Sequence, residues 1–227
     1  MKRLLLLMVY LVSPWLFPPA LSTAWFDETH VAMAKAAGYS KWFNSAGPDM
    51  IRVKMGNREG HNHFVNNPRD TSVTPGIILA QMKKYNRVDP DGHLYGAIIR
   101  SVQDYAREKR EGKYAEYHLA FCAHYVADLS QPLHNIELTA FNRKYHRDVD
   151  GIINGEVLDN LEKIKTYPIR IGSEDDLIKE VARIANLSMA LGYKLQDENR
   201  VLTKDEAYVQ IGHSTSLFKA ILEFVRN

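Results

Sequence analysis

Three side chains of the kinds that bind metals lie close together in the stretch AHYVADLSQPLH. His124 and Asp128 are four residues apart, so on a helix they share one face, one turn apart. Pro132 ends or kinks that helix, and the turn that follows brings His134 back to the same end. Imidazole nitrogens and carboxylate oxygens in this arrangement indicate a metal site. The alternative is a solvated helix face, because a histidine and an aspartate at this spacing often occur by chance.

A second group of candidate residues lies upstream. Asp49 and Arg52 follow Pro48, which suits the first turn of a helix. Their types suggest a metal carboxylate and a phosphate-binding guanidinium, although they also fit an ordinary acid at a helix start with its i+3 partner. His63 belongs to an H-x-H pair, and such pairs can equally be loop histidines. Spacing alone leaves these alternatives open.

The chain begins with a segment typical of a secretory signal peptide. Two cations precede an apolar run over Leu4–Leu16, and small residues mark a cleavage site after Ala24. We therefore expect removal of residues 1–24 and a secreted or periplasmic protein without an integral membrane segment. An uncleaved anchor helix is the alternative, which the prolines disfavour because they interrupt the run well short of about 20 residues.

Cleavage after Ala24 makes Trp25 the first residue of the exported protein. Its free α-amine, with a reference pKa of about 7.7–8.0, can chelate a metal together with its own carbonyl oxygen. His30 follows at the start of an alanine-rich helix, where a helix-start role is the alternative to a metal ligand. Loss of the leader removes two cations, so the formal net charge of +2 becomes neutral. A neutral chain disfavours a broad basic groove for duplex nucleic acid.

Helical patterns fill most of residues 25–227, and few stretches alternate with period two. These residues therefore predict one all-α domain, a multi-helix bundle, in which residues 136–150 are irregular. Capping residues, first-turn prolines and glycine breaks set the expected helix limits. The helices are expected over about 29–37, 74–87, 89–111, 113–130, 156–165, 173–195 and 203–224.

Two kinds of residue are expected to serve the structure alone. Cys122 is the only cysteine, so no intrachain disulfide is possible, and we interpret it as a buried core thiol. His93, His118 and His213 have no acidic or histidine partner at ligand spacing. Because no disulfide can form, the stability of the folded chain must come from the core or from bound metal.

The candidate metal ligands together are nitrogen and oxygen donors without a thiolate. This donor set suits zinc, with manganese or another divalent ion as the alternative. Nine donors are too many for one tetrahedral site and about right for three sites that share a carboxylate. Asp148 competes with Asp150 for the last position. The nine residues are Trp25, His30, Asp49, His63, His124, Asp128, His134, His146 and Asp150.

These residues resemble the pattern of the zinc-dependent phospholipases C and the single-strand nucleases of the nuclease P-one and S-one type. The resemblance depends on the motif His-x3-Asp-x5-His with Gln131 and Pro132 inside it, and on a tryptophan directly after a signal cleavage site. The His-x3-Asp ending at Asp150 is similar to the nuclease form. The resemblance covers Trp25 to about Asp150, and more weakly 208–218. It implies a helical protein with three zinc ions at the bottom of a cleft.

The resemblance also implies which residues hold each ion and what they do. The first ion would be bound by Asp49, His63, His124 and Asp128, the second by His134, His146 and Asp150, and the third by Trp25, His30 and a shared Asp128. Water bridging the first two ions, its pKa lowered from about 15.7 toward about 7, would attack phosphorus in line. Asp49 would orient or deprotonate this water, and Arg52 would donate to the developing charge.

Other residues bear on the substrate within this superfamily. The short spacing from Trp25 to His30, the Asp-x-x-Arg pair and the His-x3-Asp ending favour a nuclease acting on single-stranded RNA or DNA. Glu28 favours a phospholipase C, because it occupies the place of a choline-binding glutamate. Phe64 could stack on a base, whereas Asn66 replaces an aspartate that reads the base. We expect a monomeric nuclease, with a phospholipase C and a non-catalytic exported zinc-binding protein as the alternatives.

Overall fold

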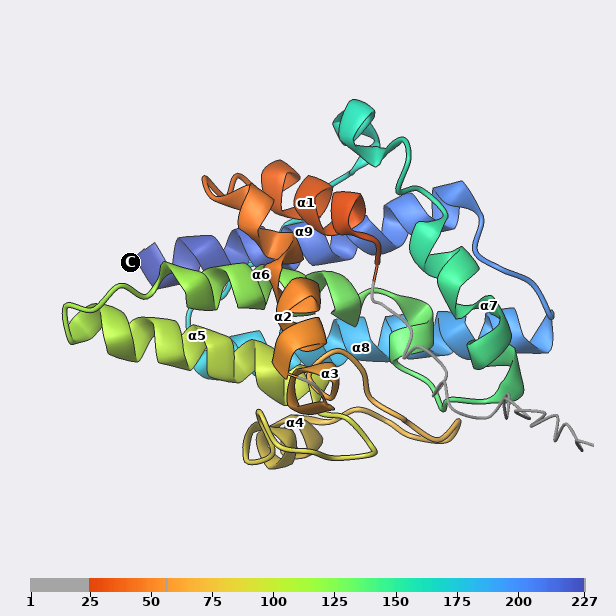
Figure 1. Cartoon of the computed structure of the whole chain (residues 1–227), viewed down its shortest axis with the longest axis horizontal. Coiled ribbons are helices and arrows are strands. Elements are labelled where there is room, and N and C mark those ends of the chain that lie inside the picture. Colours follow the sequence, from red (N-terminus) through yellow and green to blue (C-terminus); the bar gives the residue numbers. More distant parts are fainter. Residues whose placement is uncertain (1–24, 56, 227) are drawn as a thin grey trace, which may run out of the picture.

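Helices make up the regular structure of this protein in a computed structural model that describes residues 25–55 and 57–226 (Figure 1). No β-strand occurs in these two ranges, so the predicted all-α bundle is confirmed. The expected leader, residues 1–24, lies outside the described residues. The helices are α1 (Asp27–Ala36), α2 (Gly47–Met55), α3 (Asn57–Gly60), α4 (Pro75–Met82), α5 (Leu94–Arg110), α6 (Glu116–Leu129), α7 (Ala140–Gly151), α8 (Glu174–Asp197) and α9 (Lys204–Arg226), with 3-10 turns η1 (Trp42–Ala46), η2 (Pro132–His134), η3 (Val157–Asp159) and η4 (Leu161–Lys163).

Helix α6 is the central element of the bundle. It packs against α1, α2, α5, α8 and α9, and in Figure 1 the long helices α5, α6, α8 and α9 extend in the same general direction. Eleven of its 14 residues are buried, as is typical of a helix surrounded by others. His124 and Asp128 are among them, both with no exposed surface. The alternative of a solvated helix face for this pair is therefore wrong.

The chain turns back directly after α6. The side-chain oxygen of Gln131 accepts the backbone N–H groups of Leu133 and His134. Pro132 occupies the first position of turn η2, where a missing N–H leaves no bond unmade. The turn places His134 Nδ1 at 3.9 Å from Oδ1 of Asp128. The predicted return of His134 to the end of the helix is confirmed.

The prediction that residues 136–150 are irregular is wrong. Helix α7 occupies Ala140–Gly151, and its start is capped by Thr139, whose hydroxyl oxygen accepts the N–H of Asn142 at 3.2 Å. Polar residues dominate the segment, although its few apolar side chains, Phe141, Tyr145 and Val149, recur at the four-residue spacing of one helix face. The helical geometry puts His146 and Asp150 on the same face.

Some of the other helix limits agree with those predicted from the sequence, and some differ. Thr74 and Ser173 cap α4 and α8 as predicted, and Thr203 and Glu206 form the predicted capping box before α9. The helix expected over 89–111 begins only at Leu94, after a loop that contains a left-handed glycine. The helix expected over 156–165 is replaced by the two short turns η3 and η4.

Two expectations about single residues are settled by burial and contacts. Cys122 is buried and unpaired, as predicted. His118 and His93 do have acidic neighbours, contrary to expectation: His118 Nε2 lies 3.2 Å from Glu108 Oε2, and His93 Nδ1 lies 3.9 Å from Asp89 Oδ2.

In the described part of the chain, every helix is too short or too polar to cross a membrane.

Candidate metal centre

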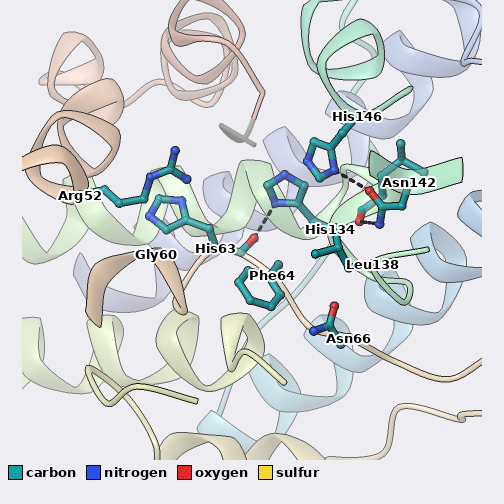
Figure 2. Close-up of a pocket in the computed structure, with 10 residues that line it drawn as sticks. Arg52, Gly60, His63, Phe64, Asn66, His134, Leu138, Asn142 and His146 are labelled. Atoms are coloured by element: carbon teal, nitrogen blue, oxygen red, sulfur yellow. Dashed lines mark hydrogen bonds between the residues drawn. The ribbon is translucent and has the colours of Figure 1, made fainter. Parts of the chain in front are cut away.

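Helix α7 and turn η2 bring two histidines together at the edge of a pocket (Figure 2). The rings of His134 and His146 lie 4.8 Å apart, measured between centroids. His146 Nδ1 donates to the side-chain oxygen of Asn142 at 2.6 Å. His134 Nδ1 donates to the backbone carbonyl of His63. Each ring therefore has its Nε2 left for a ligand, and both Nε2 atoms are buried without a hydrogen-bond partner.

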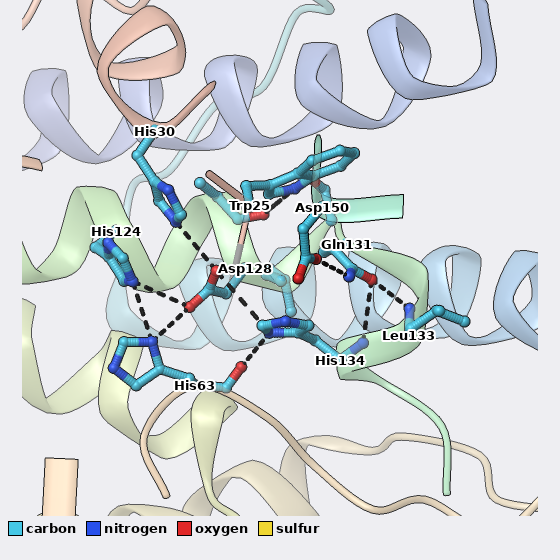
Figure 3. A network of polar contacts seen from close by, with 12 residues as sticks. Trp25, His30, His63, His124, Asp128, Gln131, Leu133, His134 and Asp150 are labelled. Atoms are coloured by element: carbon cyan, nitrogen blue, oxygen red, sulfur yellow. Dashed lines mark hydrogen bonds and ion pairs between the residues drawn. The ribbon is translucent and has the colours of Figure 1, made fainter. Parts of the chain in front are cut away.

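Asp128 lies at the centre of a buried cluster of histidines (Figure 3). Its Oδ1 is 3.1 Å from His30 Nε2, and its Oδ2 is 3.0 Å from His63 Nδ1. Oδ2 also lies 3.4 Å from His124 Nε2, and His134 approaches Oδ1. Side chains from α1, the loop after α3, α6 and η2 thus converge on one carboxylate. Both oxygens of Asp128 are therefore close to imidazole nitrogens from different elements.

Three buried groups of side chains in this region could hold metal ions, because one donor atom of each member lies within 4.8 Å of the others. The group expected for the second ion is present as a whole. The other two groups contain the four residues expected for the first ion together with His30, which was expected for the third. The three groups are His30–Asp49–His124, His63–His124–Asp128 and His134–His146–Asp150.

Trp25 is fully buried next to the cluster. Its indole N–H donates to the carbonyl of Ala127 at 3.1 Å, and the N–H of Phe26 donates to the carbonyl of Asp150 at 3.3 Å. The start of the described chain is thereby anchored to both α6 and α7, and Figure 3 shows Trp25 near Asp128 and Asp150. Chelation by its α-amine depends on cleavage before this residue, so it stays a prediction.

Burial sets the protonation states of the cluster. It raises the pKa of Asp128, but the charges of His124 and His134 and hydrogen bonds from other histidines outweigh it and hold the pKa well below the usual value. Burial lowers the pKa of His134 to about 4 and that of His146 well below the usual value. These neutral imidazoles and the ionised carboxylate are the forms that bind metals. His63 differs, because the neighbouring carboxylates outweigh its burial and raise its pKa to about 9, so its extra proton must leave when a metal binds.

Unsatisfied polar atoms indicate that the cluster needs a ligand. Asp49 Oδ1, His134 Nε2 and His146 Nε2 are buried without a hydrogen-bond partner. Leaving such an atom unpaired costs roughly 1–3 kcal/mol. Asp49 Oδ1 lies 3.8 Å from both His63 Nδ1 and His124 Nε2. Metal ions would satisfy these donors, so the residues fit divalent cations.

A pocket of about 70 Å³ opens beside the cluster. Leu133 and Leu138 contribute apolar surface to it. Glu28 is exposed at the start of α1 and does not line this pocket. The pocket is lined by three of the candidate histidines and by the side chains expected to bind phosphate, to stack on a base and to contact the edge of the base. The lining residues that the sequence had singled out are Arg52, His63, Phe64, Asn66, His134 and His146.

Several residues that hold the ligands in place were missed from the sequence. Gln131 donates to Asp150 Oδ1 through its amide nitrogen, and Asn142 orients His146. The carbonyl of Ser45 accepts His124 Nδ1–H at 2.8 Å. Asn142 was open to prediction, because it precedes His146 by four residues and a helix would align them. A backbone carbonyl in a distant segment leaves no such signal.

Two comparisons with known proteins yield no match. A scan against models of protein families finds none that matches the chain. A search of the curated proteins finds no match either. Function must therefore be inferred from the buried cluster and the pocket beside it.

Proposed function

We propose that this chain is a phosphodiester hydrolase that uses three divalent metal ions, zinc above all, and cleaves single-stranded RNA or DNA. The observation that carries the proposal is the position of three buried His/Asp groups next to a pocket that contains Arg52. Several cations beside a guanidinium suit an anionic phosphoryl group. The resemblance of the ligand order to zinc-dependent phospholipases C and nucleases supports the same reaction.

The donor chemistry supports zinc. The three groups offer only imidazole and carboxylate donors, with His124 common to two of them, and catalytic zinc sites have three such protein ligands with a fourth position open for water or substrate. Because His124 Nδ1 donates to Ser45, its Nε2 would serve one ion, the one bound with Asp49, His63 and Asp128. The amine and carbonyl of Trp25 would complete the ligands around His30. Asp128 would be shared, because both of its oxygens already face histidines of different elements.

The residues of this chain have separable tasks in the reaction. Divalent ions bound here would supply Lewis acidity toward phosphoryl oxygens and lower the pKa of water. Asp49 is suited to accept a proton from the attacking water, since burial raises its pKa and one of its oxygens has no hydrogen-bond partner. Arg52 lines the pocket and would donate to the equatorial oxygens as charge develops on them.

Two further pocket residues support a nucleotide as the substrate. The ring of Phe64 lines the pocket and offers a surface on which a base can stack. The amide nitrogen of Asn66 donates to the carbonyl of Pro90 at 2.7 Å, which fixes the side chain. Its Oδ1 would then accept a hydrogen bond from an exocyclic amino group of the base. The exposed position of Glu28, outside the pocket, gives no support to a choline site.

The substrate can be tested with the exported protein, cleaved before Trp25 and loaded with zinc. We expect release of mononucleotides from single-stranded RNA or DNA, and loss of this activity on treatment with a chelator and in Asp128→Asn. Release of phosphocholine from phosphatidylcholine vesicles, without nucleotides, would instead identify a phospholipase C. Bound zinc with neither product would identify a binding protein.

A further inference from the structure

A second buried carboxylate lies behind His63, on the side of the ring that faces away from Asp128. Glu59 of α3 is only 4% exposed. Its Oε1 lies 3.5 Å from His63 Nε2, whereas Asp128 Oδ2 lies 3.0 Å from His63 Nδ1. The imidazole therefore lies between two carboxylates, one inside the metal cluster and one outside it, and its Nε2 makes no hydrogen bond at this distance.

Glu59 is fixed by two neutral donors. The hydroxyl of Tyr125 donates to Oε1, and the amide of Asn62 donates to Oε2 at 3.1 Å. Asn62 is itself tied to Asn86, whose N–H donates to the Asn62 side-chain oxygen at 3.4 Å. Tyr125 follows His124 on α6, so the helix that carries two ligands also anchors this carboxylate. The network keeps Glu59 in place beside the ring.

His63 differs in this respect from three of the other histidines in the cluster. In these three rings Nδ1 donates a hydrogen bond to a neutral oxygen atom, and Nε2 faces the cluster; they are His124, His134 and His146. His63 is reversed, because its Nδ1 faces the cluster and its Nε2 faces a carboxylate. A carboxylate behind a metal-bound imidazole fixes the tautomer, orients the ring and makes the ligand more basic.

We propose that Glu59 is a positioning residue that tightens metal binding at the group His63–His124–Asp128 by accepting the Nε2–H of His63. This inference rests on the proposed metal centre, but it concerns metal affinity and not the substrate. Removing such a partner lowers metal affinity by about 10- to 100-fold. Glu59 belongs to none of the three donor groups and does not line the pocket, so its effect on the ion would pass through His63.

A purely structural role makes a different prediction. If Glu59 served only to join α3 to Tyr125 of α6, its replacement would lower the melting temperature of the metal-free protein and leave metal affinity unchanged. The substitution Glu59→Gln separates the two roles. It preserves the shape of the side chain and an oxygen for the Tyr125 hydroxyl, but it removes the negative charge behind His63.

The experiment measures zinc affinity by competition with a chromophoric chelator, together with the melting temperature of the metal-free protein. In Glu59→Gln we expect one ion to bind about 10- to 100-fold more weakly, while the other ions keep their wild-type affinity. Histidine ring ¹⁵N spectra should show one zinc-bound histidine coordinated through Nδ1 in the wild type. Asn142→Ala is the matched control, because it removes the support of His146 and should weaken a different ion.

Two further results complete the test. Tyr125→Phe keeps the carboxylate and removes its anchor, so it should weaken the same ion to a smaller degree, even if Glu59→Gln proves unstable. Wild-type affinity for every ion in both variants, while the wild type binds three ions, would overturn the role of Glu59 and leave the proposed function intact. A wild-type protein that binds no divalent metal would overturn both.

Discussion

The rings of His30 and His124 stack face to face, with centroids 3.8 Å apart and planes inclined by only 3°. One ring comes from α1 and the other from α6. Both turn Nε2 toward Asp128, at 3.1 Å from Oδ1 and 3.4 Å from Oδ2 respectively. The stack thus aligns two histidines from distant segments along one carboxylate, so that two neighbouring ions could share Asp128.

Sharing of Asp128 leads to the first prediction. Asp128→Asn removes a charged donor from two sites, whereas Asp150→Asn removes one from a single site. We expect the first variant to lose about two zinc ions per chain and the second about one, following the ligand count of each site. Elemental analysis of dialysed protein measures this directly. Equal zinc loss in the two variants would contradict the sharing of Asp128.

The second prediction concerns the chain terminus. An extra residue before Trp25 replaces the free α-amine by an amide nitrogen, which does not bind zinc at neutral pH. We expect about one fewer zinc ion per chain, because one closed ligand set is broken. The indole hydrogen bond to Ala127 should persist, so the metal-free melting temperature serves as the control. Unchanged zinc content and activity would refute a role for the amine.

These sites show how much of the molecule was open to prediction. The triplet His124, Asp128 and His134 was found because helix periodicity and a proline fix its geometry within 11 residues. His146 and Asp150 were found by type, but α7 was missed because polar residues dominate it. The helix explains why His146 and Asp150 belong to the same donor group. Glu59 was missed although it precedes His63 by four residues, because its position beside the ring depends on the hydroxyl of Tyr125 from the distant helix α6.

The third prediction concerns acid stability without metal. Burial lowers the pKa of His134 from the usual 6.5 to about 4, so between these values the unfolded chain binds more protons than the folded one. The contribution of His134 to the free energy of unfolding therefore falls as the pH drops from 6.5 toward 4, whereas Asp49, whose pKa burial raises, acts in the opposite sense at the acid end. His63, with a pKa raised to about 9, acts in the opposite sense only above pH 6.5.

Urea unfolding of the metal-free protein between pH 4.5 and 7 gives this dependence. We expect a loss of stability toward acid that is reduced in His134→Asn, because the substituted side chain does not titrate. His213→Asn is a useful control, since His213 of α9 belongs to none of the three donor groups, although burial lowers its pKa as well. A profile in the unsubstituted protein that matches the profile of His134→Asn would contradict the lowered pKa of His134.

The fourth prediction concerns the base. Stacking of a base on an aromatic side chain is worth about 1–3 kcal/mol, so Phe64→Ala should raise KM for single-stranded nucleic acid by about 5- to 150-fold. Zinc content should not change. Phe43→Ala is the matched control, because Phe43 is 61% exposed on η1 and does not line the pocket. Equal effects of the two substitutions would exclude a specific stacking role for Phe64.

The last prediction separates phosphate binding from metal binding. Arg52 lines the same pocket as His63, His134 and His146, but its guanidinium is not a metal ligand. Arg52→Ala should therefore keep its full complement of zinc, while kcat falls by about 10²- to 10³-fold, as for loss of one preorganised donor to a developing charge. Arg52→Lys retains the charge without the bidentate fork, so kcat should recover only in part. Loss of zinc from either variant would show that Arg52 supports the cluster itself, and an unchanged kcat would place the phosphoryl group elsewhere.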